Sequence, residues 1–367
     1  MQTGARLRVD LGALAANYRL LADEAAPAAR CGAVVKADAY GIGLEPALEA
    51  LSGAGCKVFF VATPEEGARA RDRLAEAEIY ILDGLLQGGG QEMIARDLRP
   101  VLGCTEEIEE WLELAGDGRG AAPSALHIDT GMNRLGLLAD DVDRLKAQAD
   151  LWQRLNPSLI MSHLACADTP AHPMNEQQLV RFERLRHRLP PAPASLANSA
   201  GFFLGKSYHF DLCRPGIALY GGEAVGNAPN PMRPVVLAEA RILQVKEIRA
   251  GSVGYGAAYH CPGPRRIATL AAGYADGLMR HLGREDGAPQ DSMVYIGGKP
   301  APIIGRVSMD LITVDVSDLD PEIARRGAWA ELIGPNAPVD EVARRAGTIG
   351  YEVLTSLGKR YARVYVA

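Results

Sequence analysis

The residues best suited to chemistry are a lysine and a tyrosine that follow a short apolar run. Residues 33–43 read Ala-Val-Val-Lys-Ala-Asp-Ala-Tyr-Gly-Ile-Gly, so Lys36 ends the apolar part and Tyr40 follows four residues later. A lysine at the carboxyl end of a buried strand is costly unless its charge is paired or its amine is used. One use is an imine with pyridoxal phosphate, because desolvation makes the amine nucleophilic, and Tyr40 with the glycine-flanked backbone would then meet the phosphate. The alternative is a lysine that extends from the strand end into solvent.

The elements that must position these groups alternate along the first two-thirds of the chain. Strand-like apolar runs occur at 32–36, 57–62, 79–82, 99–102, 124–129, 158–163, 195–198 and 212–214. Helix-like segments lie between most of them, at 65–74, 106–114, 141–155 and 175–189. Residues 63–66, Thr-Pro-Glu-Glu, offer a capping threonine, a proline at the first helical position and a glutamate three residues after the cap. Eight strands alternating with helices predict an α/β fold, a parallel (β/α)₈ TIM-type barrel.

The pattern changes after Gly222. Residues 227–234 hold three prolines and are interpreted as a linker. The runs beyond them are short and rich in Val, Ile and Thr: 235–245, 266–271, 293–296, 301–307, 311–316 and 361–366, with one helical stretch at 340–346. We therefore expect a barrel domain at 8–225 and a C-terminal mostly-β domain at 226–367.

Polar side chains fall where the barrel prediction places an active site, at the carboxyl ends of the strands. Five of the eight predicted strands end in or before such groups: Lys36, the 129–134 segment, His163, Asn198 with Ser199, and Arg214. Each alone has a simpler interpretation, such as a neutral core histidine for His163. Together they favour one site, because the strand prediction fixed their positions.

Composition excludes several classes of function. The net charge is −6 with no basic block, which argues against nucleic acid and anionic membranes as partners. No apolar run is long enough to span a bilayer, and the first residues lack the apolar core of a signal peptide, so we expect a cytoplasmic protein. The six cysteines form no Cys-x-x-Cys pair, so neither a metal site nor a disulfide framework is predicted.

The motifs along the whole chain resemble those of the alanine racemase family, pyridoxal-phosphate enzymes of fold type III. The matching segments follow in the family's order, at 33–43, 128–136, 213–221, 253–256, 272–277, 306–310 and 348–352. The resemblance runs from about Arg8 to Val364. It implies an isomerase that interconverts L-alanine and D-alanine, and a homodimer with shared active sites.

The resemblance also implies a role for each matching residue. Lys36 would hold pyridoxal phosphate and act as one catalytic base, and Tyr255, reaching in from the partner subunit, would be the other. The cofactor-binding residues would be Lys36, Tyr40, His163, Asn198, Ser199, Arg214, Gly216, Ile217 and Tyr351. Arg134 and Met309 would bind the substrate carboxylate, and Tyr274 and Asp310 would line the substrate entrance or be structural. Without the motif, Tyr255 between two glycines could mark only a tight turn.

The chemistry of racemisation agrees with these roles. A proton must leave one face of Cα and another must arrive at the opposite face, so two bases are needed. Free lysine and tyrosine have pKa values of about 10.4 and about 10, so each must be lowered by desolvation or nearby positive charge. Arg214 keeps its proton and would donate a hydrogen bond to the ring nitrogen without protonating it, which favours a racemase over a decarboxylase.

One position departs from the family. His127 stands where the family usually has a lysine, often carbamylated, whose negative charge orients the arginine equivalent to Arg134. Histidine cannot carry that carbamate, so we expect chloride or a neutral hydrogen bond in its place.

Three alternatives stay open at this point. The nearest is a broad-specificity amino-acid racemase, because hydrophobic pockets discriminate a methylene by only about 1–3 kcal/mol. A relative that decarboxylates basic amino acids is disfavoured by Arg214 and Tyr255. A non-catalytic cofactor-binding protein is disfavoured by the C-terminal domain, since relatives of that kind resemble the barrel alone. The direction of metabolism, toward D-alanine or from it, is not encoded in these residues.

Overall fold

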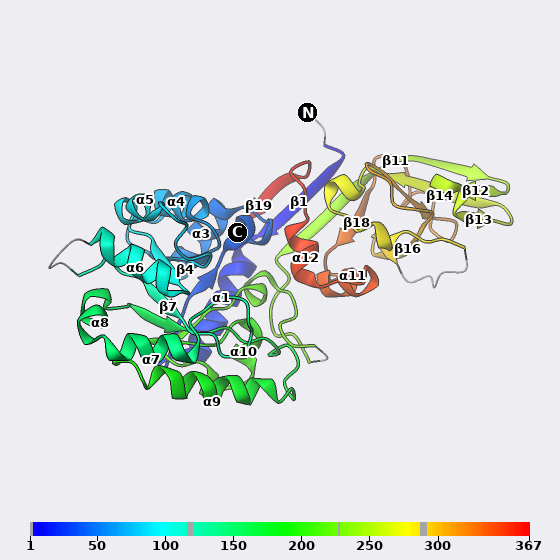
Figure 1. The fold of residues 1–367 in the computed structure, drawn as a ribbon. Helices are drawn as coiled ribbons and strands as arrows, with labels where there is room; N and C mark the ends of the chain where they lie inside the picture. Colours follow the sequence, from blue (N-terminus) through cyan, green and yellow to red (C-terminus); the bar gives the residue numbers. More distant parts are fainter. Residues whose placement is uncertain (1–2, 116–119, 227, 287–291) are drawn as a thin grey trace.

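Short buried strands form the centre of the larger unit. The computed structural model describes residues 3–115, 120–226, 228–286 and 292–367 (Figure 1). Within them, seven strands make one parallel sheet in chain order, β3 to β9. Their bounds are Ala33–Val34, Val58–Val61, Glu78–Ile81, Arg99–Leu102, Ala125–His127, Leu159–Met161 and Ala194–Ser195. These strands are almost entirely apolar because both faces are covered, one by the barrel interior and one by helices.

An eighth strand position closes the sheet into a barrel. β10 (Leu212–Cys213) pairs in parallel with β2 (Arg30–Cys31), which leads directly into β3. On its other side, the amides of Asp211 and Arg214 donate to the carbonyls of Ala194 and Ala197, at 3.0 and 2.9 Å. The predicted (β/α)₈ barrel is therefore confirmed, including the eighth strand predicted at 212–214.

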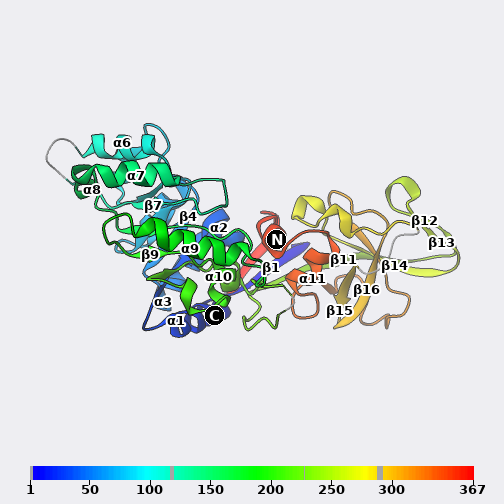
Figure 2. The same cartoon turned by 60° about the horizontal axis from the view of Figure 1, so that its bottom comes forward.

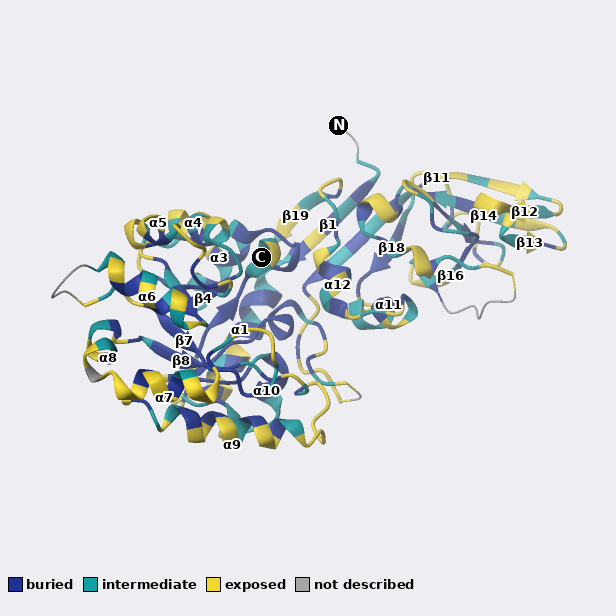
Figure 3. Ribbon diagram, in the orientation of Figure 1, coloured by how far each residue is buried: buried dark blue, intermediate teal, exposed yellow. Residues whose placement is uncertain are grey.

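Helices wrap the outside of the barrel, and their exposed sides form its surface (Figure 3). They are α1 Leu11–Ala25, α3 Leu44–Gly53, α4 Pro64–Arg73, α5 Gly90–Ala95, α6 Thr105–Leu114, α7 Ala139–Ala147, α8 Ala149–Leu155, α9 Met174–Arg186 and α10 Ser199–Phe203. Short 3₁₀ turns follow at η1 Lys206–Tyr208 and η2 Ile217–Tyr220. The predicted 141–155 helix is two helices, because Gln148 leaves helical geometry.

The predicted site residues lie just beyond the strands rather than at their last positions. β3 ends at Val34, β8 at Met161, β9 at Ser195 and β10 at Cys213. The prediction that Lys36 ends the first strand is thus wrong by two residues. Lys36 instead begins a short turn, α2 (Lys36–Tyr40), whose backbone cannot continue the ladder.

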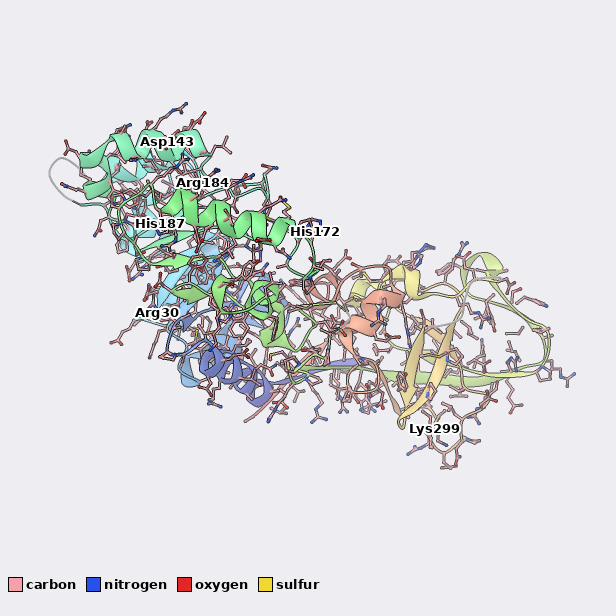
Figure 4. All side chains as sticks on the ribbon, turned by 90° about the horizontal axis from the view of Figure 1, so that it is seen from below. Arg30, Asp143, His172, Arg184, His187 and Lys299 are labelled. Carbon is pink, nitrogen blue, oxygen red and sulfur yellow. The ribbon has the colours of Figure 1, made fainter. Side chains whose placement is uncertain are left out.

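A second unit is built on one eight-stranded sheet, in the order β14-β17-β16-β15-β18-β11-β1-β19 for the described residues (Figure 2). The strands are β1 Ala5–Asp10, β11 Val236–Ile248, β14 Arg265–Leu270, β15 Met293–Ile296, β16 Lys299–Ile304, β17 Ile312–Asp315, β18 Trp329–Ile333 and β19 Ala362–Val366. β11 also pairs with β14, which curls the sheet on itself. Lys299, labelled in Figure 4, marks the outer end of β16. The predicted C-terminal β domain is confirmed, and of the predicted linker Asn227 lies outside the described residues.

Smaller elements of the second unit complete the fold. The hairpin β12 (Gly251–Val253) and β13 (Tyr259–Cys261) carries η3 (Tyr255–Ala257) between its strands. Two further turns are η4 (Tyr274–Asp276) and η5 (Arg280–Leu282). Helices α11 (Val339–Arg345) and α12 (Gly350–Thr355) pack on each other, and α12 also contacts α2 of the barrel. Among the described residues, no helix combines the length and apolar character needed to cross a membrane.

Candidate active site

A cavity of about 380 Å³ opens at the carboxyl ends of the barrel strands. All but two of the predicted site residues line it: Lys36, Tyr40, Arg134, His163, Asn198, Ser199, Arg214, Gly216, Ile217 and Tyr351. Tyr351 reaches it from α12, so the second unit contributes to the wall. The strand-end prediction therefore brought together residues from Lys36 to Arg214, whereas Tyr351 was predicted from the family resemblance alone.

Lys36 faces this cavity with an unpaired amine. Its Nζ has no hydrogen bond or ion pair with any residue that the structure describes. Burial lowers the pKa of Lys36, and the positive charge of Arg134 lowers it further, while Asp83 and Glu66 oppose the shift. A buried amine that is deprotonated more readily than usual can attack a carbonyl carbon or accept a proton.

A strained turn connects Lys36 to Tyr40. Ala37, Asp38, Ala39 and Tyr40 all have positive φ, between 53° and 56°. The left-handed conformation costs about 1–2 kcal/mol for each residue with a Cβ. Four such residues in a row are maintained only where the surroundings hold them, and such strain is often found at functional sites.

Three hydroxyl groups gather at one end of the cavity. Ser199 Oγ accepts from the amides of Gly216 (2.7 Å) and Ala218 (3.3 Å), so its own proton can point to a ligand. The hydroxyls of Tyr40 and Tyr351 have no hydrogen-bond partner among the described residues. Burial raises the pKa of both phenols, that of Tyr351 to about 12, so both stay protonated donors at neutral pH.

Packing fixes these donors in place. The Tyr40 ring stacks on Tyr220 with centroids 4.5 Å apart, and Tyr220 Oη donates to Val34 O at 3.0 Å. A Cβ at Gly216 would collide with the Tyr40 hydroxyl, so only glycine lets this backbone approach so closely. Asn198 Oδ1 accepts from Gly201 N at 2.8 Å and caps α10, which orients Ser199. The set of neutral donors fits a phosphate group.

Arg214 lies at another wall of the cavity and is only 3% exposed. Nη1 donates to Ser195 Oγ at 2.5 Å, and Nη2 donates to Ser162 O at 2.7 Å. Burial lowers the pKa of Arg214 to about 10, so it remains a cation at neutral pH, without a carboxylate partner among the described residues. A donor that does not lose its proton can polarise a ring nitrogen without protonating it.

His163 and His127 are both neutral. Nη2 of Arg214 lies 3.4 Å from His163 Nδ1, so that nitrogen accepts and the ring proton sits on Nε2. Burial and then the charge of Arg214 lower the pKa of His163 well below its ordinary value. The same two causes lower the pKa of His127 to about 4. His127 lines the cavity without a negative charge, and the hypothesis that chloride or a neutral hydrogen bond replaces the family's carbamate stays a prediction.

A buried glutamine behind this wall was not foreseen. Gln178 on α9 is fully buried, and its Oε1 accepts from Ala165 N at 2.8 Å. Its Nε2 therefore faces the other way and donates to His163 O (2.9 Å) and Thr130 Oγ1 (3.0 Å). Thr130 Oγ1 in turn lies 2.7 Å from Ser162 Oγ, beside the carbonyl that binds Arg214. The sequence signal was slight: Ser162 and Ser195 interrupt apolar strands, but Gln178 looks like any polar helix residue.

Tyr255 and Met309 lie outside this cavity. Tyr255 is 72% exposed on η3 of the hairpin, and Met309 is 53% exposed between β16 and β17. Arg360 joins the two loops of the second unit beside them, with a two-point contact to Asp276 (2.6 and 2.7 Å) and one to Asp310 (2.6 Å). Within one chain, therefore, these two predicted residues do not reach the site.

Known proteins match the chain over nearly its full length. Two family models fit it, "Alanine racemase, N-terminal domain" over residues 9–224 and "Alanine racemase, C-terminal domain" over 235–365. Similar proteins include an alanine racemase of Methylobacterium sp. strain 4-46, 50% identical over 365 residues, 99% of this chain and 98% of the relative. A biosynthetic alanine racemase of Agrobacterium fabrum is 48% identical over 372 residues, 100% of this chain and 94% of the relative. A solved structure, alanine racemase from Bartonella henselae with covalently bound pyridoxal phosphate, covers 100% of both chains at 40% identity, with a TM-score of 0.94.

Proposed function

The chain belongs to the alanine racemase family, and from this premise we propose that it interconverts L-alanine and D-alanine with pyridoxal 5′-phosphate as cofactor. The observation that carries this function is the unpaired amine of Lys36 in a cavity that also presents neutral hydroxyl donors and a buried arginine. The relative from Bartonella henselae, which holds pyridoxal phosphate covalently, supports the cofactor. When bound, pyridoxal phosphate supplies an electron-withdrawing ring that acidifies the Cα proton of an attached amino acid.

We assign the remaining roles to residues of this chain. Lys36 holds the cofactor through its amine and moves a proton on one face of Cα, since its lowered pKa favours the free base. Tyr40, Ser199 and Tyr351 donate to the phosphate, together with the backbone of Gly216 and Ile217. Asn198 acts by capping the short helix that begins with Ser199.

Residues elsewhere on the cavity wall contact the cofactor ring and bind the substrate. Arg214 donates to the ring nitrogen and His163 lies beside the ring. Arg134 has no partner among the described residues, so its guanidinium is available to the substrate carboxylate. Met309 adds a backbone donor to the same carboxylate from a second copy.

We further propose a homodimer in which Tyr255 of each copy completes the site of the other. Racemisation needs a base on the second face of Cα, and Tyr255 is exposed on its hairpin and does not line the cavity of its own chain. Leu135, at the cavity mouth, is 51% exposed, and Ile349 is exposed as well. Large apolar side chains of this kind on a rim suit a surface that a second copy covers.

Two coarser assignments accompany this function. We propose a division of the chain near residue 225, with residues up to Asp10 joined to the C-terminal domain because β1 pairs with β11 and β19. We place the protein in the cytoplasm, where its six free cysteines would stay reduced.

The function is tested by chiral chromatography after incubation of the cofactor-loaded protein with separate L-amino acids. Alanine, serine, lysine, arginine and glutamate form the panel. We expect alanine to equilibrate rapidly with little turnover of the others, and Lys36→Ala to abolish it while Lys57→Ala, at an exposed lysine, does not. Comparable turnover of larger side chains would establish a broad-specificity racemase instead. No racemisation of any amino acid would overturn the proposal.

A further inference from the structure

The left-handed turn between Lys36 and Tyr40 is the most strained segment near the cavity. Its residues Ala37, Asp38, Ala39 and Tyr40 all have φ near +55°, and none is a glycine. The turn joins the amine at one part of the cavity wall to the hydroxyl at another. Any relaxation toward the right-handed region would therefore move both groups.

Backbone hydrogen bonds within the segment hold the Ala39 amide and the carbonyls of Ala37, Asp38 and Ala39, but they leave the Asp38 amide free of the turn. The amide of Ala39 donates to Val35 O at 2.9 Å, and the amide of Gly41 donates to Ala37 O at 2.9 Å. Among the residues that the structure describes, the amide of Asp38 has no backbone acceptor and donates instead toward helix α4. The carbonyl of Asp38 accepts from Gly43 N at 2.9 Å, so the segment itself restrains that side of the residue, and the restraint on the amide comes from another element.

Glu66 of α4 supplies it. Its Oε1 accepts from Asp38 N at 3.2 Å, and its Oε2 accepts from Ala62 N at 2.9 Å. The one carboxylate thus joins the turn after β3 to the end of β4. In a capping box Glu66 would bond the amide of the capping residue Thr63, but its oxygens are engaged by the two strand ends instead.

A second contact from the same helix face reinforces the first. Arg69, one turn after Glu66, donates from Nη2 to Asp38 Oδ1 at 2.8 Å. The same carboxylate oxygen accepts from Leu44 N at 3.1 Å. Arg69 is exposed, so this ion pair is the weaker of the two restraints.

We propose that Glu66 is a positioning residue that holds the strained turn, and through it places the Lys36 amine and the Tyr40 hydroxyl for the cofactor. The inference rests on the proposed function for its activity readout only. Its other readouts are the affinity for pyridoxal phosphate and the hydrogen exchange of the turn amides. Glu66 touches neither cofactor nor substrate, because it is absent from the cavity wall.

The test compares Glu66→Gln with Glu65→Gln. The glutamine keeps the shape but leaves one acceptor oxygen for two amides, whereas the exposed Glu65 makes no contact with the turn. For Glu66→Gln we expect the dissociation constant for pyridoxal phosphate to rise about tenfold. This is the change that corresponds to the loss of one charge-assisted hydrogen bond. Amides 37–41 should exchange faster and kcat should fall, with Glu65→Gln unchanged in all three.

A second substitution separates restraint from simple charge. Glu66 also acts on the pKa of Lys36, so Glu66→Gln alone could change the amine electrostatically. Ala37→Gly removes an exposed methyl from the left-handed region and lowers the strain without touching either charge. In the double variant Ala37→Gly/Glu66→Gln, most of the lost cofactor affinity should return.

Two results would overturn the proposal. One is unchanged cofactor affinity and unchanged exchange of amides 37–41 in Glu66→Gln. The other is a loss of affinity that Ala37→Gly leaves as it was, which would mean that charge is responsible. If the wild type binds the cofactor but racemises no amino acid, the proposed function fails while these two readouts still test the role of Glu66.

Discussion

Replacement of Gln178 by methionine tests whether the wall behind His163 and Arg214 is held from α9. The side chain is fully buried and makes three hydrogen bonds, to Ala165 N, His163 O and Thr130 Oγ1. Methionine has a similar volume, so little cavity is created and the loss is mainly of hydrogen bonds. At about 1 kcal/mol for each bond, Gln178→Met should destabilise the protein by about 3 kcal/mol. For a chain of 367 residues this corresponds to a fall in Tm of about 4 °C.

Gln178→Met should also lower activity, because it displaces the segments that carry groups of the active site. The segment that contains Thr130 also carries Arg134, and His163 O belongs to the segment beside Arg214. A small displacement of positioning groups lowers the reaction rate strongly. We therefore expect kcat/KM for alanine, normalised to the amount of bound cofactor, to fall about tenfold. The matched control is Gln177→Met, next to it on α9 but exposed.

The assays are thermal unfolding followed by circular dichroism and racemisation normalised to bound pyridoxal phosphate. Thr130→Val should couple with Gln178→Met, the double variant losing less than the two single losses together, because both remove the same bond. The reasoning would be refuted if Gln178→Met matched Gln177→Met in both Tm and kcat/KM.

Two further predictions concern charge and strain. The pKa of His127 in the folded protein is about 4, below its ordinary value of about 6.5. The unfolded chain therefore takes up a proton at this residue before the folded protein does. The stability that the neutral form contributes, up to about 3 kcal/mol, is complete above pH 6.5 and is lost as pH falls toward 4. His127→Asn should flatten the fall of Tm between pH 6.5 and 4, whereas His187→Asn, at the exposed position labelled in Figure 4, should leave it as in the wild type; equal slopes in all three proteins would contradict the burial argument. Ala37→Gly should raise stability by about 0.5–1 kcal/mol, the relief of left-handed strain less the added chain entropy of glycine. Ala50→Gly, within the right-handed helix α3, should lower it by about 1 kcal/mol, and urea unfolding that showed the same sign for both would exclude the strain account.

The sequence predicted the barrel well because its signals are local. Parallel strands covered on both faces are apolar runs, and β6 of the barrel has the predicted bounds, as does β15 of the C-terminal sheet. The carboxyl ends of parallel strands lie at the same end of a barrel, so residues that follow them are expected to share one site. Lys36, His163 and Arg214 do line one cavity.

What the sequence did not predict depends on contacts between distant residues. β1 joins the C-terminal sheet because Arg6 and Leu7 pair with Glu239 and Ala238, a register that no local pattern encodes. The left-handed turn at Ala37 contradicts local preference, since alanine favours the right-handed helix. Gln178 looked like a solvent-exposed helix residue, and only its hydrogen bonds to Ala165, Thr130 and His163 reveal its role.

The central claim is that the lysine of one copy and the tyrosine of another form one active site. In a control, Tyr295→Phe, which keeps both bases, takes the place of Tyr255→Phe. In the main experiment, Lys36→Ala and Tyr255→Phe proteins are prepared separately, mixed under dissociating conditions and allowed to reassemble. Each parent should be nearly inactive, since each lacks one base at every site. In the mixture, random pairing gives half heterodimers with one intact site each, so the account predicts racemisation of alanine at roughly a quarter of the wild-type rate. Heterodimers shown to form but without activity, or a Tyr255→Phe parent as active as the wild type, would contradict it.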